Sequence, residues 1–290
     1  MRAGDMRLSV IITTYNSPIW LEKVLWGLHA QQYRDFEVII ADDGSSEETA
    51  ALLKHMRAET RLDLLHVWQP DEGFQKCRIL NKAILHADAP YLVFTDGDCI
   101  ARPDFLAEHA RNAERGYYLS GSYCKLPMET SLAITRDDIL AGRCFDMDWL
   151  RAHGLKRNRK NLKLVAPPRR AALLNRLTTT RCNFKGANGS AWRDDTLAVN
   201  GFDERMAWGG LDREFGVRLR NHGVKARHVR YNAICVHLDH SRGYRDDAIV
   251  NANKQLRLER QRSKHVRTDH GITELLAAGY APDRQQATVT

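Results

Sequence analysis

The 290-residue chain has no run of eighteen apolar residues, which is about the length that a membrane-spanning helix needs. It also shows no signal-peptide pattern, because a strand-like run already begins at Leu8. The six cysteines are scattered and contain no Cys-x-x-Cys pair, which argues against a disulfide framework or a zinc site. These absences predict a cytoplasmic protein in a reducing compartment.

Acidic residues are missing from residues 151–181, a segment with ten Lys or Arg residues. Such a segment is either a solvated loop or a surface that binds an anionic membrane or a polyanionic acceptor. The whole chain has a formal charge of +8 and a pI near 9.2, which favours an anionic partner. Because no helix-turn-helix, zinc finger or aromatic–basic RNA motif is visible, we expect no nucleic-acid partner.

Apolar runs of strand length alternate with helical patterns over the first hundred residues. Strands are expected at residues 8–12, 36–41, 62–68 and 91–95, and helices after Ser17-Pro18, after a capping box of Ser45 and Glu48, and over residues 76–86. This alternation predicts an α/β fold with a mostly parallel, Rossmann-like twisted sheet. In such sheets the ligand lies beyond the carboxyl ends of the strands.

Three polar clusters fall at such strand ends: Thr13 to Tyr15, Asp42-Asp43, and Asp96-Gly97-Asp98. Paired carboxylates after a buried strand call for a counter-charge, and a hard divalent cation shared with substrate phosphates is a natural one. A surface turn is the alternative for Asp96 to Asp98, since Asp and Gly dominate turns. An early Gly-rich phosphate loop is absent after the first strand, which excludes a nucleotidyltransferase on a similar sheet.

The chain resembles a family 2 glycosyltransferase with the GT-A fold, from about Leu8 to Tyr244. The motifs that carry the resemblance are LSVIITTYN, FEVIIADDGSSEET, YLVFTDGDC and NGFDERMAWGGLDREFGVRLRNHG. The last of these is similar to the module of galactosyltransferases and chondroitin-synthase-type enzymes. Leu211 departs from the pattern, because relatives commonly have Glu at that place.

The resemblance implies a donor site for a nucleotide sugar, expected to be a UDP-sugar, with Mn²⁺ or Mg²⁺ as cofactor. Asp98, Asp96 and His237 are the expected metal ligands, with His240 as an alternative to His237; an ordinary packed histidine is the alternative for both. An imidazole ligand suits Mn²⁺ better than Mg²⁺. The expected nucleotide-binding residues are Thr13, Tyr15, Asp43, Arg78, Asp96 and Asp98. Among them, Tyr15 would stack on the base, Asp43 would accept its imide N–H, and Arg78 would pair with phosphate or with Asp96.

Family 2 enzymes invert the anomeric centre, so a base must take the proton of the attacking acceptor hydroxyl. Asp212 matches that base, and Glu214 is the weaker candidate because it points to the other side of the same helix. The expected acceptor-binding residues are Trp208, Gly209, Gly210 and Asp203. Packing of Trp208 as a loop anchor and backbone bonding of Asp203 in its turn remain alternatives.

The chain is therefore expected to divide into a nucleotide-sugar-binding half (1–120), a variable basic region (121–182), an acceptor and catalytic-base module (183–245) and a polar helical tail (246–290). The predicted activity is metal-dependent transfer of a sugar to a glycan or lipid-linked acceptor, in cell-surface polysaccharide or lipopolysaccharide synthesis. The basic region would hold the enzyme peripherally at the inner membrane face. The alternative is a catalytically inactive GT-A-like module that binds a glycan or nucleotide.

Overall fold

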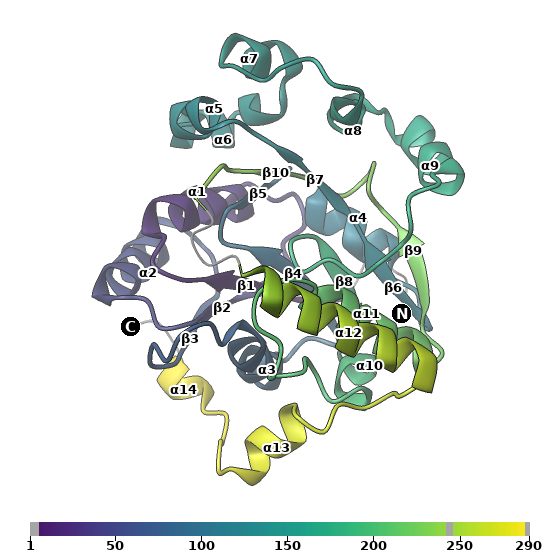
Figure 1. Cartoon of the computed structure of the whole chain (residues 1–290). Coiled ribbons are helices and arrows are strands. Elements are labelled where there is room, and N and C mark those ends of the chain that lie inside the picture. The colour runs from purple at the N-terminus through teal and green to yellow at the C-terminus, as the bar shows by residue number, and fades with distance from the viewer. Residues whose placement is uncertain (1–5, 242–245, 288–290) are drawn as a thin grey trace.

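The chain forms an α/β structure around one seven-stranded sheet, seen in the computed structural model in Figure 1, which describes residues 6–241 and 246–287. The residues that end the predicted acceptor module, Tyr244 and Arg245, lie outside the described residues. The strands of the large sheet run in the order β3-β2-β1-β4-β8-β6-β9. They are β1 (Leu8–Thr14), β2 (Phe36–Asp42), β3 (Leu64–Trp68), β4 (Tyr91–Asp96), β6 (Tyr117–Ser120), β8 (Gly189–Trp192) and β9 (Lys225–His228).

Parallel pairing relates β3, β2, β1 and β4, whereas β8 is antiparallel to both β4 and β6. The register sets Thr13 of β1 beside Asp96 of β4, and Thr14 beside Asp42 of β2. The polar residues predicted at the strand ends therefore meet at one edge of the sheet. The expected α/β class with a mostly parallel sheet is confirmed.

A second, three-stranded sheet lies beside this edge, in the order β5-β10-β7. Its strands are β5 (Cys99–Ala101), β7 (Ser122–Lys125) and β10 (Ile234–His237). Strand β5 follows β4 directly, and its Cys99 pairs with His237 across the antiparallel β5–β10 ladder. This sheet therefore joins β10, which lies late in the chain, to the Asp96–Asp98 turn.

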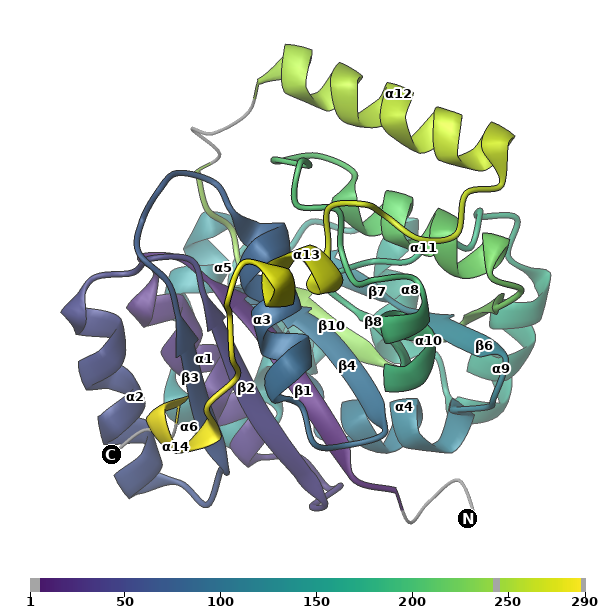
Figure 2. The ribbon, with the colours of Figure 1, turned by 90° about the horizontal axis from the view of Figure 1, so that it is seen from below.

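Helices cover both faces of the large sheet, as the two views in Figures 1 and 2 show. The helices are α1 (Pro18–His29), α2 (Glu47–Glu59), α3 (Lys76–His86), α4 (Phe105–Asn112), α5 (Met128–Ala133), α6 (Arg136–Leu140), α7 (Met147–Ala152), α8 (Leu162–Val165), α9 (Pro168–Leu177), α10 (Arg193–Ala198), α11 (Leu211–Asn221), α12 (Asp247–Ser263), α13 (Ile272–Ala277) and α14 (Arg284–Ala287). Two short 3₁₀ turns lie at Arg143–Phe145 and Arg159–Asn161. Within the described residues, no helix combines the length and the apolar character needed to cross a bilayer.

The core is split in two by the sheet, because successive strand residues point to opposite faces. Val10 and Val38 pack on one face with α1, α2 and α4, whereas Ile11 and Ile39 pack on the other with α3 and α11. On the second face, Phe94 of β4 contacts three further phenylalanine rings, including Phe215 of α11. This packing fixes the start of α11 at the same edge as the strand ends.

Most elements expected from the sequence are confirmed, including the helix over residues 76–86. The capping box of Ser45 and Glu48 is wrong, because α2 begins at Glu47 and has no side-chain cap. The Ser45 hydroxyl instead accepts the N–H of Asn16 at 2.8 Å, and the Ser45 N–H donates to Asp42. Ser45 thus ties two strand-end loops together rather than starting the helix.

Candidate active site

The Asp96-Gly97-Asp98 turn follows β4 at the centre of the sheet edge. Gly97 fits tightly there, because a Cβ at this position would lie 3.0 Å from the carbonyl oxygen of Thr13. The Gly97 N–H donates to that same carbonyl at 2.9 Å, which holds the turn against β1. The close approach therefore favours glycine between the two carboxylates.

Asp98 faces two histidines from the end of β10. Its Oδ2 lies 3.5 Å from Nε2 of His237 and 3.0 Å from Nε2 of His240. The two imidazole rings stack with their centroids 5.5 Å apart. Burial alone would raise the pKa of Asp98, but the hydrogen bond from His240 and the charges of both histidines lower it below its usual value.

Both histidines are oriented by backbone carbonyls. Nδ1 of His237 lies 2.6 Å from the Leu238 oxygen, and Nδ1 of His240 lies 2.7 Å from the Ser241 oxygen. Because a carbonyl only accepts, each Nδ1 carries a proton. Nε2 therefore donates to Asp98 when the ring is charged, and it has a lone pair for a cation when that second proton is absent. This is the tautomer that a metal-ligating histidine needs, so the donor set fits a divalent cation.

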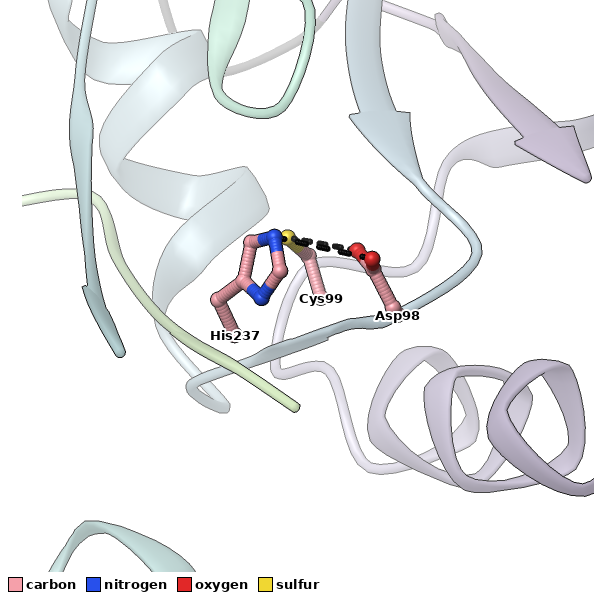
Figure 3. Close-up of side chains that lie close together, drawn as sticks. All are labelled: Asp98, Cys99 and His237. Atoms are coloured by element: carbon pink, nitrogen blue, oxygen red, sulfur yellow. Dashed lines mark hydrogen bonds and ion pairs between the residues drawn. The ribbon is translucent and has the colours of Figure 1, made fainter. Parts of the chain in front are cut away.

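Cys99 is the third member of a compact group, with ligand atoms of Asp98, Cys99 and His237 all within 4.8 Å of one another (Figure 3). Its thiol donates to Asp98 at 3.4 Å. A hydrogen bond with Cys235 and burial raise the pKa of Cys99 well above its ordinary value. The carboxylate and the imidazoles are therefore the atoms that could hold a metal, and the protonated Cys99 thiol supports Asp98.

Asp96 pairs with Lys76, the first residue of α3, and not with Arg78 as the sequence suggested. Lys76 Nζ lies 2.7 Å from Asp96 Oδ1, which also accepts the hydroxyl of Thr13 at 2.9 Å. Arg78 instead points toward Gln75 and Glu72. The two positions are two residues apart on a helix, about 200° around its axis, so only Lys76 faces the strand ends.

The residues predicted to bind the base lie along one side of this edge. Asp43 is buried and accepts hydrogen bonds from Gln69 Nε2 at 2.7 Å and from the Gln75 N–H at 2.9 Å. Burial raises the pKa of Asp43 despite these bonds. Tyr15 is 51% exposed, and its hydroxyl donates to Asp71 at 2.8 Å. An exposed ring beside a buried acid can stack on a base and accept from its edge.

Asp212 lies in the first turn of α11, where the helix dipole favours a negative charge. It accepts the Arg213 N–H at 2.8 Å and lies 3.4 Å from the N–H of Gly186. Burial raises the pKa of Asp212, although these N–H groups and the charges of Arg213 and Lys76 oppose the shift. A carboxylate with a raised pKa is suited to accept a proton.

Glu214 has a different place, although it lies only two residues away. It is fully buried and forms a two-pronged ion pair with Arg218, with N–O distances of 2.7 and 2.9 Å. Both carboxylate oxygens are therefore occupied inside the core. Only Asp212 of these two acids lies at the sheet edge.

The loop before α11 is held in a conformation that requires glycine. Gly209 and Gly210 have φ values of 107° and 90°, in the left-handed region. Asn253 of α12 donates to the carbonyl oxygens of Ala207, Trp208 and Gly209 at 3.1 to 3.3 Å. Helix α12 thus fixes the loop that carries Trp208. This tryptophan is partly exposed and lies four residues before Asp212 in the sequence.

Asp203 is not brought to this site, contrary to the expectation of an acceptor contact. Its side chain is fully buried and accepts from Arg205 at 2.7 Å and from the Thr268 hydroxyl at 2.7 Å, with Arg260 at 3.7 Å. These bonds use both carboxylate oxygens. Asp203 therefore anchors the polar tail to the turn before α11.

Sequence reasoning missed Lys76, Gln69 and Asp71, which all lie in or beside the β3–α3 connection. That connection carries Asp71, Gly73 and Lys76 within six residues, a polar loop entering a helix, and this is the signal that could have marked it. From the sequence, His237 and His240 were alternatives to each other, whereas the structure places both beside Asp98.

The sheet order and the site at its carboxyl edge define a GT-A-like α/β fold. Residues 9–166 match the family described as glycosyl transferase family 2, and the chain belongs to that family. It is 30% identical over 233 residues to validoxylamine A glucosyltransferase from Streptomyces hygroscopicus subsp. jinggangensis. The aligned region covers 75% of this chain and 52% of that protein. It is 28% identical to Escherichia coli chondroitin synthase over 77% of this chain and 33% of the relative.

Solved structures show the same fold at lower identity. A mannosyltransferase from Pyrobaculum calidifontis, in complex with GDP-Man and Mn²⁺, aligns with a TM-score of 0.56 and 20% identity over 98% of this chain and 68% of that one. Staphylococcus aureus TarS in complex with UDP-GlcNAc aligns with a TM-score of 0.55 and 14% identity over 97% of this chain and 78% of that one. The chain spans about half the length, or less, of the curated relatives named here.

Proposed function

We propose that this protein transfers a sugar from a UDP-sugar to a hydroxyl group of a glycan or lipid-linked acceptor, with inversion at the anomeric carbon. The observation that carries the proposal is the convergence of Asp98, His237 and His240 at the strand ends where Asp96 and Lys76 pair. Family membership and the GT-A-like fold support it. The site's charges suit a diphosphate. Lys76 supplies a cation for it, and Asp98 and the histidines could hold a divalent cation that would bind it as well.

In this scheme Asp98, His237 and His240 hold a divalent cation, with Asp96 beside them. Such a cation would act as a Lewis acid that offsets the negative charge on the departing diphosphate. Tyr15 stacks on the base and Asp43 accepts its imide N–H. Burial lowers the pKa of Lys76, but the charge of Asp96, followed by those of Asp98 and Asp212, raises it overall, so Lys76 stays cationic near phosphate.

Asp212 takes the proton from the acceptor hydroxyl as that oxygen attacks. The first turn of α11 and the loop of Trp208 orient the acceptor sugar against it. The Gly186 N–H orients the Asp212 carboxylate, and burial raises the pKa of Asp212, which makes it a stronger base than a free aspartate. Asp212 lies within the electrostatic reach of Lys76, which supports one continuous site.

The first experiment measures binding of nucleotide sugars to the full chain by thermal shift, with Mn²⁺, with Mg²⁺ and with EDTA. Ligands that bind the folded state raise the apparent melting temperature. We expect UDP-sugars with Mn²⁺ to give the largest shift, and Asp98→Ala to abolish the metal-dependent part. Asp148→Asn, an exposed acid on α7, is the matched control. Full activity in EDTA would overturn the metal assignment.

An inactive GT-A-like binding module would pass that binding test, so turnover must be measured as well. UDP release from the preferred donor, with and without a glycan acceptor, distinguishes the two functions. Acceptor-dependent release that is lost in Asp98→Ala supports the enzyme. Tight UDP binding without any release, over a broad acceptor panel, supports the binding module.

We also propose peripheral contact with an anionic membrane, through a surface on α8 and α9 that we call the α8–α9 surface. It combines exposed Leu162, Val165, Leu173 and Leu177 with exposed Arg157, Arg159, Lys160 and Arg170. Apolar side chains among cations are typical of interfacial helices. Lys163 is part of the same basic segment, but it is buried and therefore does not belong to this surface.

A further inference from the structure

Three cations near the candidate active site have no acidic partner among residues 6–241 and 246–287. They are Lys163 of α8, Lys185 in the segment before β8, and Arg230 between β9 and β10, and we call them the cation triad. Lys163 is buried, and the other two are partly buried. Burial lowers the pKa of Lys185 and the charge of Arg230 adds to the shift, whereas the charge of Asp212, the proposed base, opposes it.

The triad lies against the site already described. Lys163 Nζ donates to the Ser122 hydroxyl at 2.8 Å and to the Tyr123 carbonyl at 3.1 Å. The Tyr123 ring in turn packs on the ring of His237, with centroids 4.8 Å apart. Lys185 immediately precedes Gly186, whose N–H points at Asp212. The triad is therefore bracketed by the proposed metal ligand on one side and the proposed base on the other.

Arg230 is the member of the cation triad whose buried N–H groups lack acceptors among the described residues. Its Nε and Nη1 are buried and have no hydrogen-bond acceptor within the described part of the chain. Buried donors without acceptors are costly, and a buried cation without a counter-charge more so. Burial lowers the pKa of Lys163 to about 8, and the charges of Arg230 and Lys185 add to the shift. The three groups thus repel one another, and an anion between them would relieve the repulsion.

A cationic groove of about 710 Å³ lies between α4, α9 and β9, and two of its lining residues, His228 and Asn232, flank Arg230 in the sequence. His228, whose pKa is lowered by burial and then by Arg230 and Lys185, lines the groove together with Arg111, Arg169, Arg176 and Arg227. Glu108 pairs with Arg111 and Glu114 with Arg227, whereas Arg169 and Arg176 have no acidic partner in the ranges that the structure describes. The groove therefore has an excess of positive charge.

We propose that the cation triad binds a carboxylate on the acceptor glycan, and that the groove binds the units that follow. The inference rests on the proposed function and names its acceptor class. Arginine's fork matches a carboxylate or phosphate, and flanking lysines add charge without demanding a fixed geometry. Lys185 adjoins Gly186, whose N–H contacts the proposed base, and a base acts on the acceptor hydroxyl, which favours the acceptor over the transferred sugar of the donor.

The test is direct binding, measured by calorimetry on the full chain without nucleotide. The probe is a tetrasaccharide of alternating glucuronic acid and N-acetylglucosamine, compared with its carboxyl-reduced neutral form. We expect at least tenfold tighter binding of the acidic form. Arg230→Gln and Lys185→Gln should each remove that preference, whereas Lys54→Gln, an exposed lysine on α2, should keep it. Equal binding of both forms, or preference retained in both triad variants, would overturn the inference.

A second arm separates the acceptor from the donor. Thermal shift with UDP and Mn²⁺ should be unchanged in both triad variants, which also shows that they are folded. If wild-type protein prefers UDP-glucuronic acid to UDP-glucose, and Arg230→Gln loses that preference while tetrasaccharide binding is unchanged, the acid belongs to the donor and our assignment is wrong. Failure of UDP to bind wild-type protein would contradict the proposed function instead, independently of the tetrasaccharide result.

Discussion

Asp212 and Glu214 are two acids in one helical turn with opposite environments. Asp212 accepts two backbone N–H groups at the sheet edge, whereas Glu214 is paired with Arg218 inside the core. The first arrangement leaves an acid able to exchange a proton with a ligand. In the second arrangement, the charge of Glu214 is neutralised by Arg218. Removing Glu214 would leave the buried Arg218 without a counter-charge.

We therefore expect Asp212→Asn to lower turnover by about 10² to 10⁴, the usual contribution of a general base, while UDP binding stays within about twofold. The change keeps the shape of the side chain and removes its basicity. In wild-type protein, activity should fall as the pH drops through the raised pKa of Asp212, because the protonated acid cannot accept a proton.

Steady-state kinetics and UDP titration check this prediction. Glu214→Gln is the informative comparison, since we expect it to reduce stability through Arg218 rather than to act on chemistry alone. A folded Glu214→Gln without turnover, beside an Asp212→Asn with normal turnover, would reverse the two roles.

The sequence predicts residues at strand ends better than residues on helices or tails. Asp96, Asp98 and Thr13 could be placed because an apolar run marks each strand and parallel strands end at one edge. Lys76 and Arg78 could not be distinguished, because the rotation of α3 about its axis is set by packing of residues such as Leu80. The cation triad joins three distant segments, so no local pattern could predict it.

At the scale of elements, α4 is joined to the sheet by a buried histidine. His109 is fully buried, with Nδ1 2.7 Å from the Ser190 hydroxyl and Nε2 3.1 Å from Asn188 Oδ1. The Asn188 amide nitrogen donates to the carbonyls of Ser122 and Ala233, which fixes its oxygen as the acceptor for Nε2–H. Nδ1 therefore accepts from Ser190, and the ring is neutral.

Burial lowers the pKa of His109 to about 4, from 6.5 for a free imidazole. Between these values the unfolded chain binds a proton that the folded protein does not, so stability rises with pH there. The contribution is complete above pH 6.5 and is lost as the pH falls toward 4. We expect this group alone to reduce the free energy of unfolding by about 2 kcal/mol between pH 7 and pH 5.

Urea unfolding at both pH values measures this change. His109→Gln should be less stable at pH 7 and should show a smaller loss on acidification. His55→Gln, an exposed histidine on α2, should keep the wild-type pH dependence. An unchanged slope in His109→Gln would contradict the assignment.

The α8–α9 surface is an element-scale feature as well. Leu173 and Leu177 of α9 are 56% and 67% exposed, and they lie among cations of the same segment. Each cation close to an anionic bilayer contributes about 1 kcal/mol, screened by salt. In Figure 1, α8 and α9 lie on the opposite side of the molecule from α13 and α14.

We expect salt-reversible flotation of the protein with vesicles that contain phosphatidylglycerol, and none with purely zwitterionic vesicles. Leu173→Ser with Leu177→Ser should weaken binding, as should Arg157→Gln with Arg159→Gln and Lys160→Gln. Leu276→Ser, on exposed α13, is the matched control. Equal flotation with both vesicle types would remove the membrane role and leave α8 and α9 as a solvated surface.

At the scale of the whole molecule, the polar tail returns to the first strands of the chain. Helix α12 packs along α11, α13 lies on α3, and α14 contacts β3, as Figure 2 shows. Only a polar, helix-prone tail was expected from the sequence. Its path could not be predicted, because the contacts that guide it are single polar pairs with residues far away in the sequence, such as Arg260 with Asp203 and Arg284 with Glu37.

One such pair joins the C-terminal helix α14 to strand β2 near the start of the chain. Arg284 of α14 lies 2.7 Å from Glu37 of β2, whose side chain is fully buried. Glu37 also accepts the Ser9 hydroxyl at 2.6 Å and the Asp88 N–H at 2.9 Å. Burial would raise the pKa of Glu37, but these bonds and Arg284 lower it, so the carboxylate is charged at neutral pH.

Removing Arg284 should therefore leave the buried Glu37 carboxylate with only the half-exposed Arg7, 4.0 Å away, as a cationic partner. We expect Arg284→Met to lower the free energy of unfolding by about 2 kcal/mol, less than for a fully buried pair because Arg284 is 32% exposed. Adding Glu37→Gln to Arg284→Met should recover part of the loss, since the uncompensated charge is then gone. Urea unfolding of the two single variants and the double variant measures the coupling, with Arg262→Met on exposed α12 as control. Additive losses in the double variant would mean that the tail is held by packing of α13 and α14, and that the Glu37–Arg284 pair adds nothing to it.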